Sequence, residues 1–179
     1  MEKKPTLFSN SLIFGLLTSI IVVLYSILLM SMETQNQALS ILSYLLVLGG
    51  MAYGTITYRN KALDGFISYG HALKSCVLIV LVIAIVTALF IYIYVSIDNS
   101  FIEKALDKAE EEMATKDMPE EQMEMGLEYA RKFMQPHWMA IMSFIAYMFF
   151  GFILALIVAA VVKKDNPNPF INTIDSSVN

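Results

Sequence analysis

The sequence predicts an all-α integral membrane protein with four transmembrane helices and an amphipathic helical hairpin outside the membrane between the third and the fourth. Hydrophobic residues make up 57% of the 179 residues and charged residues only 16%, with a mean hydropathy of +0.62. An ordinary soluble domain has about a quarter of its residues charged. The second observation is four apolar runs, each close to the roughly 20 residues that cross a bilayer as a helix.

The predicted spans cover residues 11–30, 39–57, 76–95 and 138–162, and none contains an acidic or basic side chain. A helix in a soluble core keeps a polar face, so runs that are apolar on every side favour lipid. The first run follows Lys3 and Lys4, as a signal peptide would. It is longer than the 7–15 apolar residues of a signal core and no small-x-small cleavage pattern follows it, so we expect it to remain as an anchor.

Lysine and arginine indicate the orientation, because positive residues near the spans resist translocation. With four spans, both termini and the middle loop share one side, which carries Lys3, Lys4, Arg59, Lys61, Lys74, Lys163 and Lys164. The other side has none in its short first turn and five in its long loop: Lys104, Lys108, Lys116, Arg131 and Lys132. We therefore expect both termini to be cytoplasmic and the loop at 96–137 to be extracytoplasmic.

The 96–137 loop predicts two short amphipathic helices. In the first, apolar residues recur at helical spacing: Phe101, Ile102, Ala105, Leu106, Ala109 and Met113. Pro119 suits the first turn of the second, whose apolar stripe is Met123, Leu127, Ala130 and Met134, flanked by Gly126 and Phe133. Helices this short are only marginally stable alone in water, so they should pack on each other, on the membrane surface or on a partner.

Methionines in this loop raise the alternative of a Cu(I) site, since thioethers with an imidazole can bind that ion. The candidate ligands are Met113, Met118, Met123, Met125, Met134 and His137. Met123 and Met125 face different sides of a helix, and methionine commonly fills loosely shaped apolar faces. We expect ordinary packing, with no metal and no cofactor.

The segment at 64–74 has Gly65 and Gly70 bracketing an apolar aromatic stretch, which predicts a short interfacial segment before the third span. A connecting elbow is the favoured interpretation and a functional contact surface is the alternative. His71, within it, is expected to be an interfacial side chain with water access rather than a ligand or pH sensor.

Small residues four apart form the remaining pattern, and such faces let membrane helices approach closely. The candidate helix-packing residues are Gly50, Gly54, Ala84, Ala88, Gly151, Ala155 and Ala159. Packing within the chain is favoured, and self-association through one of these faces is the alternative.

Several function classes are disfavoured. Ion-coupled carriers normally hold an ionisable group inside the membrane, and the spans contain no acidic or basic residue. We expect no catalytic residues and no enzyme, because no nucleophile with a base, ligand cluster or phosphate-binding loop has a recognisable spacing. The acidic pI of about 5.1 argues against a nucleic-acid partner.

Loop motifs carry a family resemblance over nearly the whole chain. They are Tyr58-Arg-Asn-Lys61, Gly65-Phe-Ile-Ser-Tyr-Gly70, Ala72-Leu-Lys74, Asp98-x-x-Phe101-Ile-Glu103, Met118-Pro-Glu-Glu-Gln-Met123 and Phe133-Met-x-Pro136-x-Trp138. In these the chain resembles domain-of-unknown-function family 4199, small bacterial membrane proteins. The resemblance implies a bacterial inner-membrane setting and no particular chemistry.

Two hypotheses for function remain. The first is a membrane-embedded interaction or accessory protein, with the bilayer and a second copy or another membrane protein as partners. The second is a transporter or channel component for a neutral solute, lined by hydroxyls such as Thr18, Ser19, Ser26, Ser43, Thr55, Thr57, Thr87 and Ser143. In both cases the chain forms a single membrane domain, with a disordered tail at 165–179.

Overall fold

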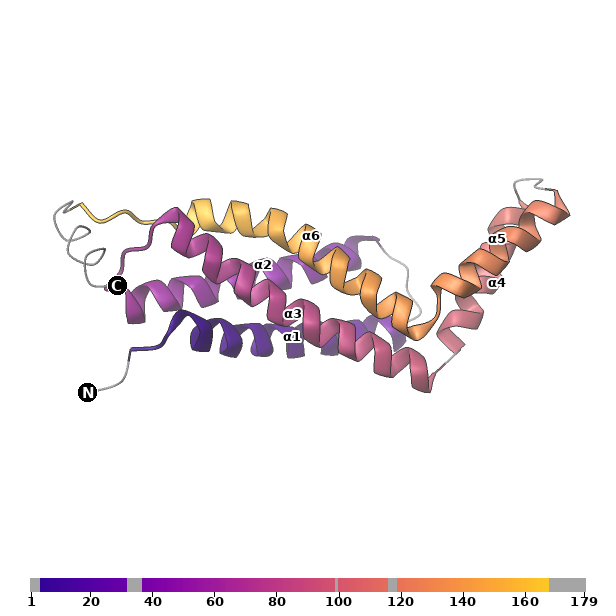
Figure 1. Ribbon diagram of the computed structural model, residues 1–179, viewed down its shortest axis with the longest axis horizontal. Coiled ribbons are helices and arrows are strands. Elements are labelled where there is room, and N and C mark those ends of the chain that lie inside the picture. Colours follow the sequence, from indigo (N-terminus) through magenta and orange to yellow (C-terminus); the bar gives the residue numbers. More distant parts are fainter. Residues whose placement is uncertain (1–3, 32–36, 99, 116–118, 168–179) are drawn as a thin grey trace. The chain divides into compact units, whose positions relative to one another are not determined.

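The structure, a computed structural model, describes residues 4–31, 37–98, 100–115 and 119–167. Within these ranges the chain folds into six helices (Figure 1): α1 (Leu7–Ser31), α2 (Gln37–Ala62), α3 (Tyr69–Ile97), α4 (Ser100–Ala114), α5 (Glu120–Phe133) and α6 (Pro136–Val162). The prediction of an all-helical fold is confirmed. Most of the predicted tail at 165–179 lies outside the described residues.

Four of the helices, α1, α2, α3 and α6, are long and apolar enough to cross a membrane. The structure extends the predicted spans at their polar ends. In particular, α3 begins at Tyr69 rather than residue 76, and α2 continues to Ala62 rather than residue 57. A 29-residue α3 is about 44 Å long at 1.5 Å per residue, which exceeds the roughly 30 Å hydrocarbon core. A helix of this length is long enough to extend beyond the hydrocarbon core.

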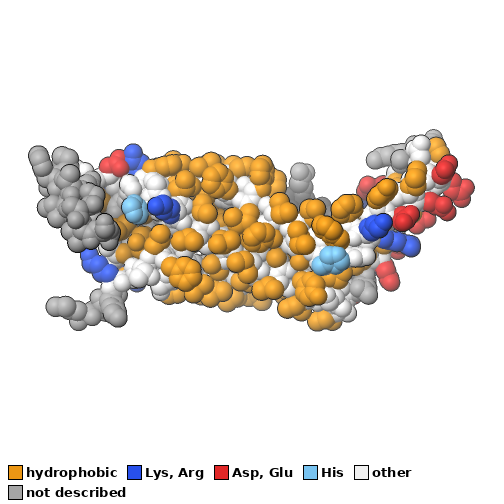
Figure 2. Space-filling model, in the orientation of Figure 1, with side chains coloured by type: hydrophobic (Ala, Val, Ile, Leu, Met, Phe, Trp, Pro, Cys, Tyr) orange, Lys and Arg blue, Asp and Glu red, His pale blue; other side chains and the backbone are white. Residues whose placement is uncertain are grey.

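Hydrophobic side chains cover most of the surface of these helices that is visible in Figure 2. On α1, for example, Leu17, Leu24 and Leu28 are all more than half exposed. A soluble monomer rarely exposes contiguous apolar surface on this scale, so the surface fits an integral membrane protein.

The chain forms two compact units. The first joins Met1–Ile83 with Met148–Asn179, and the second is Ala84–Tyr147. In the first unit the most deeply buried side chains include Val22 of α1, Met51 of α2, and Ile79 and Val80 of α3. The second unit contains α4 and α5, which pack on each other as a hairpin.

Candidate functional site

Two predicted glycines of α2 lie where α1 comes close. A Cβ atom at Gly50 would collide with the Thr18 side chain, and one at Gly54 would lie 2.8 Å from both Phe14 Cβ and Ile79 Cδ1. The absence of a side chain at Gly54 thus lets α1, α2 and α3 meet at one level. At Gly49, next to this pair, a Cβ would meet no atom within 4 Å.

The predicted small residues of α6 lie on its buried face. Gly151, Ala155 and Ala159 are all buried, and a Cβ at Gly151 would collide with Val80 of α3. On α3 itself Ala84 is fully buried and Ala88 half-buried.

A further small-residue row, missed in the sequence, lies on α1. Ser11, Gly15 and Ser19 are four residues apart and all buried. A Cβ at Gly15 would lie 2.6 Å from Val82 Cβ and 3.2 Å from the Ile79 carbonyl oxygen. The same four-residue spacing that marks Gly50 and Gly54 was the available signal, once serine is counted as small.

Polar side chains join the helices inside this apolar core. Asn10 Nδ2 of α1 donates to the Gly54 carbonyl oxygen at 2.9 Å. Thr55 Oγ1 of α2 donates to Ser75 Oγ of α3 at 3.1 Å and lies 3.3 Å from Cys76 Sγ. Since an unpaired polar group in hydrocarbon is unfavourable, such contacts fix which helix faces meet.

At one end of the first unit, which we call the connector end, side chains and backbone tie α2, the α2–α3 linker and the residues after α6 together. Arg59 Nη1 donates to the carbonyl oxygen of Val162, the last residue of α6, at 3.0 Å. That carbonyl has no partner within its own helix, and a cation is favourable at a helix C-terminus. Ile67 and Lys164 form an antiparallel bridge, in which each backbone nitrogen donates to the other residue's carbonyl oxygen at N···O distances of 2.9 and 3.0 Å.

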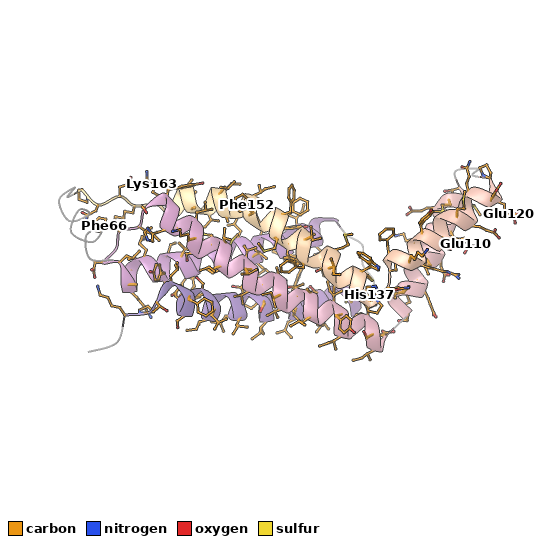
Figure 3. All side chains as sticks on the ribbon, viewed as in Figure 1. Phe66, Glu110, Glu120, His137, Phe152 and Lys163 are labelled. Atoms are coloured by element: carbon orange, nitrogen blue, oxygen red, sulfur yellow. The ribbon has the colours of Figure 1, made fainter. Side chains whose placement is uncertain are left out.

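Two cationic contacts complete the connector end, where Figure 3 labels Phe66. Lys164 Nζ lies 5.5 Å from the centroid of the Phe66 ring, and Lys4 Nζ lies 3.0 Å from both carboxylate oxygens of Asp64. The Lys4–Asp64 pair is largely exposed, so it contributes at most about 1 kcal/mol. Asp64 and Gly65 have φ values of 52° and 89°, the left-handed conformation that turns the chain out of α2.

The segment predicted to connect the spans at 64–74 is helical from Tyr69 onward. Gly70 and His71 belong to the first turn of α3, so the non-helical linker is only 63–68. Ser68 precedes that helix, and its Oγ lies 3.1 Å from His71 Nδ1. His71 is exposed, in agreement with water access.

In the second unit, α4 and α5 pack through the predicted stripes. Ile102, Leu106 and Met113 of α4 are half-buried, as are Met123 and Leu127 of α5. A Cβ at Gly126 would lie 3.1 Å from Met113 Cε. Met113 and Met123 therefore serve the hairpin's own packing, while Met118 lies outside the described residues.

A second apolar face on α5 was missed in the sequence. Met125, Tyr129 and Phe133 follow one another at four-residue intervals and are 51%, 63% and 54% exposed. We call these three residues the outer stripe. These three residues recur at helical spacing. Because they lie next to the face that packs on α4, the sequence shows one broad apolar stripe where the structure has two adjacent faces.

The hairpin also separates charge along its length. Near its tip are Glu110, Glu111, Glu112, Glu120, Glu121 and Glu124, and near its base acidic residues are balanced by Lys104, Lys108, Arg131 and Lys132. Figure 3 shows Glu110 and Glu120 at the end of the hairpin away from His137. Among the described residues, no three His, Cys, Asp or Glu side chains cluster as a metal site would require.

The exposed carboxylate of Asp98 lies just before the first residue of α4. The Ser100 N–H donates to Asp98 Oδ1 at 2.9 Å, two residues along the chain, as in an Asx turn. Hydrogen bonds from the side chain and the backbone of Ser100 hold the pKa of the Asp98 carboxyl below its ordinary value, since both favour the charged form.

A comparison with protein families assigns the chain. The model of the family described as "Protein of unknown function (DUF4199)" matches residues 10–164. The chain belongs to the DUF4199 family. This confirms the resemblance seen in the loop motifs. No curated protein and no solved structure matches the chain.

Two loop motifs of this DUF4199 protein meet at the connector end. Arg59 belongs to the Tyr58–Lys61 motif and Phe66 and Ile67 to the Gly65–Gly70 motif, and these residues contact Val162 and Lys164. The family match ends at Lys164, the residue that pairs with Ile67. These motif residues therefore hold helix ends together.

Proposed function

We propose that this DUF4199 protein is a multi-pass protein of the bacterial cytoplasmic membrane that acts as an interaction or accessory protein rather than as an enzyme. The observation that supports this most is α5. It is a 14-residue helix with no buried residue, although it packs on α4. Such a helix adds little to the stability of the membrane helices, and its surface is free to contact another protein.

Charge supports a specific orientation for this proposal. The connector end gathers Lys4, Arg59, Lys163 and Lys164, and it faces the cytoplasm because positive residues resist translocation. The hairpin then lies on the outer side of the membrane. The partner is another membrane protein or a second copy of this chain.

Photo-crosslinking in native membranes tests the proposal. A crosslinking amino acid placed at Glu121 or Glu128, both exposed on α5, should capture the same protein from both positions. The matched control is Leu24, an exposed residue of α1 that faces lipid and should capture no protein. Two differently tagged copies of the chain distinguish a second copy from another protein. Absence of any discrete product at both α5 positions would contradict an interaction function.

One observation favours transport of a neutral solute as a second candidate. Within the second unit, the buried hydroxyls of Thr87 and Ser143 have no hydrogen-bond partner among the described residues, as oxygens lining a solute path would. Against it, Ser19 and Ser26 donate to the carbonyls of Leu16 and Val22 in their own helix. Liposomes containing the protein should pass glycerol no faster than empty ones. A flux that Thr87→Val abolishes would favour transport instead.

A further inference from the structure

The outer stripe is the largest apolar surface of the hairpin that no described residue covers. Met125, Tyr129 and Phe133 expose more than half of each side chain. Along α5 they lie within about 40° of one direction at 100° per residue. The glutamates of α5 point elsewhere: Glu124 lies on nearly the opposite side of the helix from Tyr129. The helix thus has one face for α4, one for water and one without a partner.

This stripe continues into the surface of the next span. The Phe133 and Trp138 rings lie 6.1 Å apart, centroid to centroid, and Trp138 starts a row on α6 with Ile141, Met142 and Ile145. Each of these four residues is 40–52% exposed. They share one helix face by their spacing of three and four residues. Only two residues, Met134 and Gln135, separate α5 from α6, so the C-terminal end of α5 stays at the membrane surface.

The side chains match the chemistry of the lipid headgroup layer. Tyrosine and tryptophan prefer this layer because their rings are partly polar, and an amphipathic helix can bury its apolar face about 5–10 Å into it. Lys132, in the last turn of α5, lies about 60° around the helix from Tyr129 at 100° per residue and can extend its cation to lipid phosphates beside the stripe. The glutamates of α5 do not share the face of the stripe, so docking through the stripe would leave them in water.

We infer that the outer stripe docks on the lipid bilayer that holds the spans, with Met125, Tyr129 and Phe133 in the headgroup layer and the acidic face of α5 turned to water. This goes beyond the proposed interaction function, and it does not depend on which side of the membrane carries the hairpin. Docking would present one fixed face of α5 to a partner.

Fluorescence of the full chain in phosphatidylcholine vesicles tests the inference. In a Cys76→Ser background, cysteine is placed at Tyr129 or Met125 on the stripe and, as the matched control, at Glu124 on the opposite face. Each is labelled with an environment-sensitive dye. All three positions are exposed, so substitution leaves no cavity, and circular dichroism checks the fold.

The stripe positions should show blue-shifted emission and quenching by doxyl groups on the lipid chains, and the Glu124 position should be quenched by aqueous iodide instead. Equal iodide quenching at all three positions would overturn the inference, because the stripe would face water. Protection from iodide without doxyl quenching would also overturn it, since a protein would then cover the stripe. Equal doxyl quenching at every position would overturn it by removing the distinction between faces. A failed crosslinking experiment with α5 would leave these outcomes unchanged.

Discussion

At the scale of single residues, two nearby glycines of α2 have opposite surroundings. An alanine Cβ at Gly54 would lie 2.8 Å from Phe14 Cβ, which sits close to its own backbone, whereas one at Gly49 would meet no atom within 4 Å. We predict that Gly54→Ala lowers the free energy of unfolding by about 1–3 kcal/mol through overpacking. Gly49→Ala should raise it slightly, by up to about 1 kcal/mol, because alanine favours a helix. Melting in detergent measures both, and equal effects would contradict close packing at Gly54.

Arg59 provides a second test at this scale. We predict that Arg59→Gln lowers the free energy of unfolding by about 1.5–3 kcal/mol, because it removes a charged hydrogen bond to the last carbonyl of α6. Lys61→Gln, in the same turn of α2 and exposed, removes the same charge and should stay within about 0.5 kcal/mol. Denaturation of both variants in the same detergent decides the matter. A similar loss of unfolding free energy in both variants would mean that positive charge at the end of α2, rather than the hydrogen bond to α6, stabilises the protein.

Sequence spacing could indicate packing glycines but not their neighbours. Gly50 and Gly54 stand four apart in an apolar run, and that pattern predicts close approach of another helix. Which helix approaches depends on how α1 and α3 rotate, and spacing within α2 holds no information on that. The contact between Arg59 and Val162, 103 positions apart, is equally hidden in the sequence.

At the scale of elements, the start of α4 depends on the ionised Asp98. Since hydrogen bonds from Ser100 lower the pKa of Asp98, these bonds are formed above the ordinary carboxyl pKa and are lost as the pH falls through the lowered value. We predict that carbon NMR of the Asp98 carboxyl titrates below the range of an ordinary aspartate. Ser100→Ala should move this pKa upward, and Glu103→Gln, in the first turn but not its partner, should not. An unchanged pKa in Ser100→Ala would contradict a hydrogen bond from the Ser100 hydroxyl to Asp98.

The existence of the helices could be predicted from the sequence. The residues at which they end and the partner of each helix face were harder to predict. The helix α3 begins seven residues before the span predicted from residue 76, because its polar first turns do not look like a membrane span. Those residues are helical because backbone hydrogen bonds within a helix do not require lipid. On α5 the outer stripe was missed, since burial against α4 cannot be read from an apolar pattern that spans two adjacent faces.

At the scale of the whole molecule, the number of long apolar helices follows from composition and run length alone. Lipid selects for apolar residues on all sides of a helix, and this signal needs no knowledge of tertiary contacts. The arrangement of connectors is a tertiary property: the bridge between Ile67 and Lys164 joins segments that are far apart in sequence. Orientation rests on the distribution of cations, and it remains a prediction.

Cysteine accessibility tests the proposed membrane topology most directly. In a Cys76→Ser background, which removes the single native cysteine, Glu121→Cys on α5 and Lys61→Cys at the end of α2 are treated with an impermeant maleimide. We predict labelling of Glu121→Cys in intact cells and of Lys61→Cys only after the membrane is permeabilised. The reverse pattern would invert the topology, and labelling of both positions in intact cells would contradict a hairpin and a connector end on opposite sides of a membrane.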